Sequence, residues 1–166
     1  MAQRVAILTC VGNDDDGTGP GHTSLVIDSN TYSFEAIVAM TAWKTFTTRA
    51  YVADNTHRPL VIQELARGRV DANAVLRYIR ITAAMGLDYL QHGVCSQQAS
   101  MALSAGIRAG FNPRGIDTPW AVYAHAANRG LASDTYMIWS GSSGADQKLK
   151  YDFPTVTRTG NGILSW

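Results

Sequence analysis

The sequence has little charge, and this shortage excludes several classes of protein. Charged residues make up 16% of the 166 residues, hydrophobic residues make up 46%, and the formal net charge is +1. Because the lysines and arginines are scattered, they give no electrostatic footprint for nucleic acid or for an anionic membrane surface. With 15 glycines and 5 prolines, the composition is typical of a globular chain and not of a disordered or fibrous one.

Long hydrophobic runs are missing as well, and there are only two cysteines. Apolar stretches such as residues 5–11 fall far short of the ~20 residues that span a bilayer. That run is also too short for a signal peptide and lacks a small-x-small cleavage site. We therefore expect no membrane span, and a location in the cytoplasm or export by a specialised secretion system. Cys10 and Cys95 are expected to be reduced thiols, because a core of this size needs no disulfide.

Length and turn signals predict a single domain, residues 1–166, with strands in its first half. Residues 4–10 form a β-prone run that ends at the glycine- and aspartate-rich stretch 12–21. Residues 22–28 and 31–35 are separated by the turn-forming pair Ser29–Asn30, a pattern that predicts a hairpin. Residues 45–52 predict a further strand, and residues 40–44 before them fit a helical turn.

From Asp71 onward the hydrophobic spacing becomes helical. Apolar residues recur three and four positions apart after this N-cap residue, namely at Val75, Leu76, Ile79, Ile81, Met85 and Leu87. A second helix is predicted over 95–109 and a third over 118–128, with Thr118 as its cap and Pro119 at its first position. Residues 135–140 and 151–159 predict strands. The whole pattern indicates an α+β domain.

Cys95 is the candidate nucleophile because it opens the second predicted helix. A helix N-terminus offers unpaired backbone N–H groups and the positive end of the dipole, and both stabilise a thiolate. The same N–H groups can receive the oxyanion of a tetrahedral intermediate. By itself, a cysteine that opens a helix is more often structural, so this feature needs partners.

His22 and Glu35 are the candidate partners. His22 begins a predicted strand directly after the glycine-rich stretch, and functional side chains gather at such strand ends. Glu35 lies on the partner strand of the predicted hairpin, where its carboxylate would hold one ring nitrogen of His22 and leave the other as a base. The alternative is that His22 is an ordinary surface or core residue and that Glu35 faces solvent.

Two segments carry a resemblance to a known family. Residues 93–107 (GVCSQQASMALSAGI) resemble the nucleophile helix of the NlpC-type cysteine peptidases, in which a cysteine opens a helix of small and aliphatic residues. Residues 117–123 (DTPWAVY) resemble the Thr-Pro-led helix that often follows it. The resemblance implies a papain-like fold, in which an antiparallel sheet packs against the helix that bears the nucleophile.

The order of the two catalytic segments resembles the circularly permuted branch of that superfamily. Here residues 21–27 (GHTSLVI) and 32–35 (YSFE) precede the cysteine, whereas in the ordinary branch the cysteine comes first. The permuted branch includes bacterial enzymes of unassigned substrate and the lecithin:retinol acyltransferase group. The nucleophile motif of that group usually reads Asn-Cys-Glu-His, which differs from residues 94–97 (VCSQ), so lipid acyl transfer is less favoured.

Other arrangements of reactive residues fit their chemistries less well. Cys10 falls at a strand end, and His125 falls inside a helix. His92 and Cys95 have ligand-like spacing, but no second pair completes a zinc site. The acidic run 14–16 would put Gly12 and Thr23 at the first and last ligand positions of an EF-hand, where carboxylates are needed. Residues 12–18 lack the lysine of a phosphate-binding loop. We expect no metal and no cofactor.

The sequence therefore predicts a cysteine hydrolase in which Cys95 attacks a carbonyl, His22 is the base and Glu35 orients the ring. By resemblance, the preferred substrate is an amide bond in a bacterial cell-wall peptide, and the protein would act as an exported effector toxin paired with an immunity protein. The alternatives are a lipid or thioester acyl hydrolase or acyltransferase of the same fold, and a non-catalytic binding module in which Cys95 is merely buried.

Overall fold

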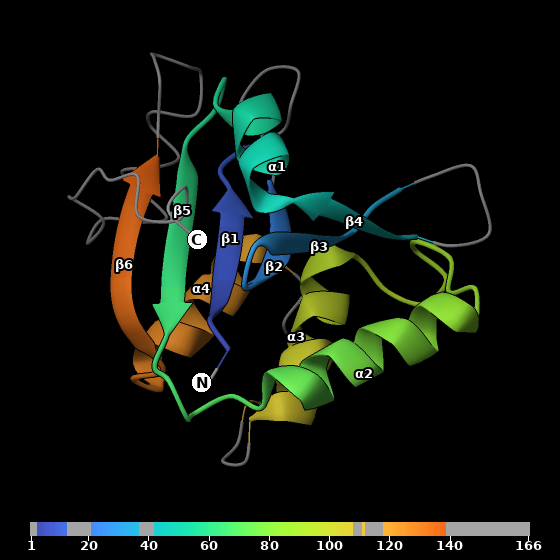
Figure 1. Ribbon diagram of the computed structural model, residues 1–166. Coiled ribbons are helices and arrows are strands. Elements are labelled where there is room, and N and C mark those ends of the chain that lie inside the picture. Colours follow the sequence, from blue (N-terminus) through green and yellow to red (C-terminus); the bar gives the residue numbers. More distant parts are fainter. Residues whose placement is uncertain (1–2, 13–20, 37–41, 108–110, 112–117, 139–166) are drawn as a thin grey trace.

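The computed structural model describes residues 3–12, 21–36, 42–107, 111 and 118–138. These residues form one antiparallel sheet of six strands and four helices (Figure 1). The strands are β1 (Val5–Cys10), β2 (His22–Ile27), β3 (Asn30–Phe34), β4 (Trp43–Thr47), β5 (Leu60–Leu65) and β6 (Ala132–Ile138). The helices are α1 (Thr48–Asn55), α2 (Ala72–Ala84), α3 (Cys95–Gly106) and α4 (Pro119–Asn128). The α+β class predicted from the sequence is confirmed.

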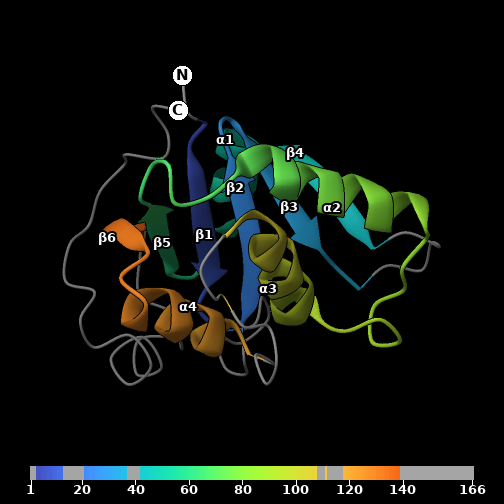
Figure 2. The same ribbon diagram turned by 90° about the horizontal axis from the view of Figure 1, so that it is seen from below.

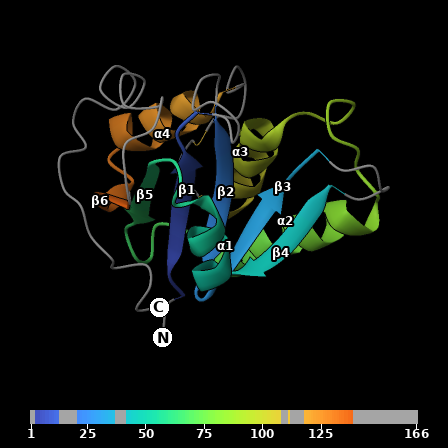
Figure 3. The same ribbon diagram turned by 90° about the horizontal axis from the view of Figure 1, so that it is seen from above.

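The helices divide unequally between the two faces of the sheet, whose strand order is β4-β3-β2-β1-β5-β6. Helices α2, α3 and α4 cover one face (Figure 2), and α1 lies against the other (Figure 3). All six residues of β1 are buried, because this strand is covered on both faces. Ile7 packs into the cluster under α2, α3 and α4, whereas Leu8 and Cys10 pack into the cluster under α1, as the alternation of a strand requires.

Helices α2 and α3 pack closely against each other and against the sheet. The larger core cluster contains Val75 and Ile79 from α2 and Leu103 from α3, and each buried side chain of this size contributes about 1.5–3 kcal/mol. Their approach depends on Gly106, where a Cβ atom would lie 2.7 Å from the Asp71 carbonyl oxygen. Any larger residue would push the two helices apart, and with them the N-terminus of α3.

The predicted hairpin is present, but its turn lies one residue earlier than expected. Strands β2 and β3 are joined by Asp28 and Ser29, with Asp28 in the left-handed region at φ 52°. Aspartate tolerates this conformation, and its carboxylate accepts a hydrogen bond from the Arg4 N–H at 3.0 Å. The pairing therefore sets Ser24 opposite Ser33. A turn at Ser29–Asn30 would have moved every partner by two residues.

The strand predicted over 45–52 is wrong in its second half. Strand β4 ends at Thr47, and α1 begins at Thr48. The Thr47 side chain accepts a hydrogen bond from the Ala50 N–H at 3.3 Å and so caps the helix. The residue types favoured a strand, but the cap and the burial of Tyr51 and Val52 against the sheet favour the helix. The helical turn expected at 40–44 is not found at Trp43 and Lys44, which belong to β4.

Three helix starts were predicted correctly. Asp71 caps α2 by accepting from the N–H groups of Asn73 and Ala74, Cys95 opens α3, and α4 starts at Pro119 with Thr118 as its cap. The apolar face predicted for α2 is only partly right, because Ile81 and Met85 are exposed near the end of the helix.

Strand β5, which lies between β1 and β6, was not predicted from the sequence, although five of its six residues are buried. The strand predicted over 135–140 corresponds to β6, which starts earlier, at Ala132. The helix predicted over 95–109 ends earlier, at Gly106, because Ile107 is extended. The strand predicted over 151–159, most of the loop 12–21 and residues 108–109 lie outside the described residues. In the described part of the chain, no helix is long and apolar enough to cross a bilayer.

Candidate active site

Cys95 is the first residue of α3, and its thiol lies where the first turn of the helix leaves amide hydrogens uncapped. The N-cap is Val94, whose side chain has no group that can accept a hydrogen bond. Gln97 Oε1 accepts from the Val94 N–H at 2.9 Å, and the first N–H bonded back to the helix is that of Gln98, to the Val94 carbonyl. The first-turn amides of α3 therefore point into the site with the positive end of the helix dipole.

His22 and Cys95, which are 73 positions apart in sequence, lie close enough to interact. The His22 ring is hydrogen-bonded to the Cys95 thiol, and the Thr23 N–H and the Tyr89 hydroxyl also donate to this sulfur. Burial, the largest influence, raises the pKa of Cys95. The bond to His22, its charge and the two other donors together outweigh burial, so the pKa of Cys95 lies below its ordinary value. This surrounding stabilises a thiolate although the residue is only 4% exposed.

The position of His22 depends on the glycine before it. Gly21 has φ +79°, and a Cβ atom there would lie 2.2 Å from the Cys10 carbonyl oxygen. No other residue type fits this geometry without a shift of backbone. His22 is thereby fixed as the first residue of β2, at the end of the sheet, where its ring reaches the N-terminus of α3.

Ser33 holds the other side of the His22 ring. Its Oγ lies 2.6 Å from His22 Nε2, which leaves Nδ1 as the nitrogen that meets the thiol. Ser33 is fully buried on β3 and lies opposite Ser24 of β2. Ser33 was not predicted as a site residue from the sequence. The signal was present, because Ser33 lies two positions before Glu35 and side chains two positions apart in an extended chain share a face.

Glu35 lies beside the site but has a different partner from the one expected. Its carboxylate forms an ion pair with Lys44, with 3.0 Å between Oε2 and Nζ, whereas the partner of His22 Nε2 is Ser33. The structure thus gives the contact that the sequence assigned to Glu35 to a neutral hydroxyl on the same strand. The Lys44 and Glu35 side chains are 42% and 24% exposed, so solvent weakens their interaction.

Tyr89 is a further site residue that the sequence analysis missed. Its hydroxyl donates to the Cys95 sulfur and accepts from the Cys95 N–H, and its ring stacks on Phe34 with 5.6 Å between the centroids. Burial and the nearby charge of Cys95 raise the pKa of Tyr89 to about 12, so this group remains a donor at neutral pH. The hydroxyl therefore interacts with both the backbone amide and the sulfur of Cys95.

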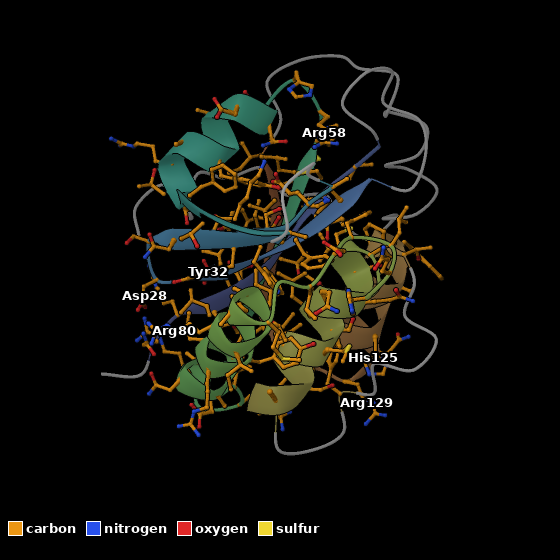
Figure 4. All side chains as sticks on the ribbon, turned by 90° about the vertical axis from the view of Figure 1, so that its right-hand side faces the viewer. Asp28, Tyr32, Arg58, Arg80, His125 and Arg129 are labelled. Atoms are coloured by element: carbon orange, nitrogen blue, oxygen red, sulfur yellow. The ribbon has the colours of Figure 1, made fainter. Side chains whose placement is uncertain are left out.

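A cleft of about 730 Å³ leads to His22 and Tyr89 from the α1 side of the sheet. Charged side chains line it, including Glu35, Lys44, Asp54 and Arg58. Figure 4 shows Arg58 beside α1, on the opposite side of the molecule from His125 in α4. The two side chains that interact with the sulfur of Cys95 thus line this cleft, whereas Cys95 itself is not among its lining residues.

The rival residues lie elsewhere. Cys10 is fully buried on β1, and its thiol donates to Asn55 Oδ1 at 3.8 Å. His125 lies within α4, where its ring meets Phe111 edge-to-face at 4.5 Å, and His92 Nδ1 accepts from the Asp88 N–H. Among the residues that the structure describes, no three histidine, cysteine, aspartate or glutamate side chains are grouped to hold a metal ion.

Comparisons with protein-family models, with curated proteins and with solved structures found no match to this chain. The assignment of a function therefore depends on the arrangement of Cys95, His22, Ser33 and Tyr89.

Proposed function

We propose that this protein is a cysteine hydrolase of the permuted papain-like type, with Cys95 as nucleophile and His22 as general base. The observation that carries the proposal is the contact of the two side chains at the N-terminus of α3, where three donors lower the pKa of a nearly buried thiol. Structural thiols buried in apolar surroundings keep their proton, whereas thiols among donors at a helix N-terminus are nucleophilic.

The reaction begins when His22 Nδ1 takes the proton of Cys95 Sγ and the sulfur attacks a carbonyl carbon. The carbonyl oxygen becomes an oxyanion, which receives hydrogen bonds from the Cys95 N–H and from the Tyr89 hydroxyl. These bonds replace the one from the Cys95 N–H to the Tyr89 oxygen and the one from the Tyr89 hydroxyl to the sulfur. Loss of one such donor typically raises the barrier by about 2.7–4 kcal/mol.

The tetrahedral intermediate collapses when the imidazolium of His22 donates its proton to the leaving amine. The carbon–nitrogen bond breaks and an acyl group remains on Cys95 Sγ. Water, deprotonated by His22 Nδ1, then attacks the thioester, and the thiol leaves with its proton restored. Ser33 keeps the ring in place through both halves of the cycle.

The substrate that we propose is an amide bond in a bacterial cell-wall peptide. Its support is the resemblance of residues 93–107 and 21–27 to the NlpC-type peptidases, together with a cleft lined by charges of both signs, which suits a peptide with ammonium and carboxylate groups. Such an enzyme would be exported by a specialised secretion route and held inactive in its producer by an immunity protein.

The test is digestion of purified peptidoglycan by the wild-type protein and by Cys95→Ser, followed by mass spectrometry of the soluble fragments. We expect new amine and carboxylate ends with the wild-type protein only, and a growth defect when that protein is directed to the periplasm. An acyl adduct on Cys95 after incubation with phospholipid would instead identify an acyltransferase. Equal, slow reaction of Cys95 and Cys10 with iodoacetamide would favour a non-catalytic binding module.

A further inference from the structure

Three hydroxyl groups are buried together behind the His22 ring. Ser24 and Ser33 face each other across β2 and β3, with 3.2 Å between their oxygens, and the Tyr51 hydroxyl of α1 lies 2.8 Å from Ser24 Oγ. Ser24 is 1% exposed, Ser33 is 0% exposed and Tyr51 is 5% exposed. The surrounding cluster is otherwise largely apolar, and burying hydroxyls there is costly unless their hydrogen bonds are complete.

The direction of these hydrogen bonds follows from a count of protons, because each hydroxyl has one hydrogen to donate. Ser24 donates to Ser33, so in the contact between Ser24 and Tyr51 the donor must be Tyr51. The Ser33 hydroxyl interacts with both His22 Nε2 and the Tyr51 oxygen, and its proton can be directed at either one. In the arrangement that leaves Nδ1 as the base, the Ser33 proton is directed at the tyrosine oxygen. Each member of this group of three, the hydroxyl ring, then donates once within the ring.

This arrangement decides how Ser33 meets His22. When its own hydrogen is directed at Tyr51, Ser33 Oγ accepts at the 2.6 Å contact with His22 Nε2. Nε2 must therefore carry a hydrogen, and in the neutral imidazole the lone pair is left on Nδ1. Because Nε2 is in contact with Ser33, Nδ1 is the ring nitrogen left for the Cys95 thiol.

We propose that Ser33, Ser24 and Tyr51 are positioning residues, which hold His22 in the tautomer that can accept the proton of Cys95. The inference builds on the proposed function and adds its third component, which is a neutral hydroxyl ring in place of the carboxylate of Glu35. Tyr51 is central to it, because this residue acts on the tautomer through Ser33.

The experiment measures the His22 tautomer and the Cys95 alkylation rate in two variants. Ser33→Ala removes the acceptor for Nε2, and Tyr51→Phe leaves Ser33 free to turn its hydrogen toward Nε2. In long-range ¹⁵N–¹H spectra we expect the wild-type ring to carry its hydrogen on Nε2 and each variant to gain the Nδ1–H form. The rate of Cys95 alkylation by iodoacetamide at pH 7 should fall about five- to tenfold in each, the effect of one neutral hydrogen bond.

Two further variants separate this role from ordinary stability. Thr31 lies on the same strand and the same face, is fully buried and bonds to Thr48 at 3.1 Å. Thr31→Val therefore removes a matched buried hydroxyl, and it should leave both measurements unchanged. Ser33→Thr keeps the hydroxyl and should restore both measurements to wild-type values.

Failure of the inference is distinguishable from failure of the proposed function. A wild-type Cys95 that reacts no faster than Cys10 would overturn the proposed function. A reactive, His22-dependent Cys95 whose rate and tautomer are the same in wild type, Ser33→Ala and Tyr51→Phe would overturn the hydroxyl ring alone. A wild-type ring with its hydrogen on Nδ1 would also overturn it.

Discussion

The two cysteines have similar burial and opposite surroundings. Cys10 is 0% exposed and Cys95 is 4% exposed, so burial does not separate them. The thiol of Cys10 donates to the Asn55 side-chain oxygen at 3.8 Å, an acceptor that favours the protonated thiol, and it lies 3.9 Å from the Tyr51 hydroxyl. The thiol of Cys95 faces His22, the Thr23 N–H and the Tyr89 hydroxyl, all of which stabilise the anion. The difference teaches that the polarity of the partners, and not access to solvent, distinguishes the thiol that we propose as the nucleophile from the other one.

The largest expected effect comes from His22→Ala, which removes the base and leaves Cys10 untouched. At pH 7 we expect Cys95 in the wild type to react with iodoacetamide at least about a hundredfold faster than Cys10, and the variant to lose this advantage, since a positioned base contributes 10²–10⁴-fold. Mass spectrometry of the two labelled peptides gives both rates in one sample, with Cys10 as the internal reference. An unchanged Cys95 rate would remove His22 from the mechanism.

A second large effect is expected at Gly21, which packs against the Cys10 carbonyl and directly precedes His22. Gly21→Ala places a Cβ atom against the Cys10 carbonyl and strains a φ of +79°, so we expect a loss of about 3 kcal/mol in the free energy of unfolding. The matched control is Gly68→Ala, because Gly68 has φ +80° and nothing within 4 Å of the added atom. The Gly68→Ala variant should lose only about 1–2 kcal/mol of the free energy of unfolding, the part that comes from the left-handed backbone conformation. Urea unfolding measures both, and equal losses would refute the close contact.

A change in pH dependence is expected for Tyr89→Phe, which removes one donor from the Cys95 sulfur. Because the folded protein lowers the pKa of Cys95, its thiolate persists as the pH falls below the ordinary value of about 8.5 and disappears only as the pH passes the folded value. Loss of the Tyr89 hydrogen bond should shift the midpoint of the alkylation profile to higher pH. The urea-unfolded chain provides the reference, where both cysteines should titrate alike. A midpoint that stays in place would show that Tyr89 does not stabilise the thiolate.

The smallest effect is expected for Glu35→Gln. Glu35 pairs with Lys44 in a partly exposed position, and such ion pairs are worth about 0–1 kcal/mol. We expect the Cys95 alkylation rate to change less than about twofold, in contrast to the fall expected for Ser33→Ala. A large loss in Glu35→Gln would return the orienting role to the carboxylate.

Local signals in the sequence were sufficient for the elements that begin with a capping residue or contain a tight turn. Asp71, Thr118 and Pro119 act through backbone groups within a few positions of themselves, so α2 and α4 could be predicted from their neighbours. Thr47 sends the same kind of signal, but the β-branched and aromatic residues around it concealed α1. Strand β5 lies between β1 and β6, and no turn motif marks where it begins. Its position could therefore be recognised only from its pairing in the sheet.

The site residues that could be predicted from the sequence are those marked by a local feature of the chain. Cys95 and His22 stood out because a helix start and a strand start are local features. Ser33 depends on the register between β2 and β3, which the one-residue displacement of the turn to Asp28 and Ser29 changes by two positions. Tyr89 depends on the path of the chain from α2 into α3, and no sequence spacing encodes that path.

The β2–β3 hairpin has a consequence for the order in which the molecule becomes reactive. His22, Ser24 and Ser33 lie within 12 consecutive residues, and such short-range pairings form early in folding. The thiol of Cys95 is more than 60 residues further along the chain and meets this hairpin only when α3 docks. We therefore expect Cys95 of the nascent or half-folded chain to be alkylated only at the ordinary rate of an exposed thiol. In brief reagent pulses during refolding, the faster rate should appear at Cys95 only in the final phase.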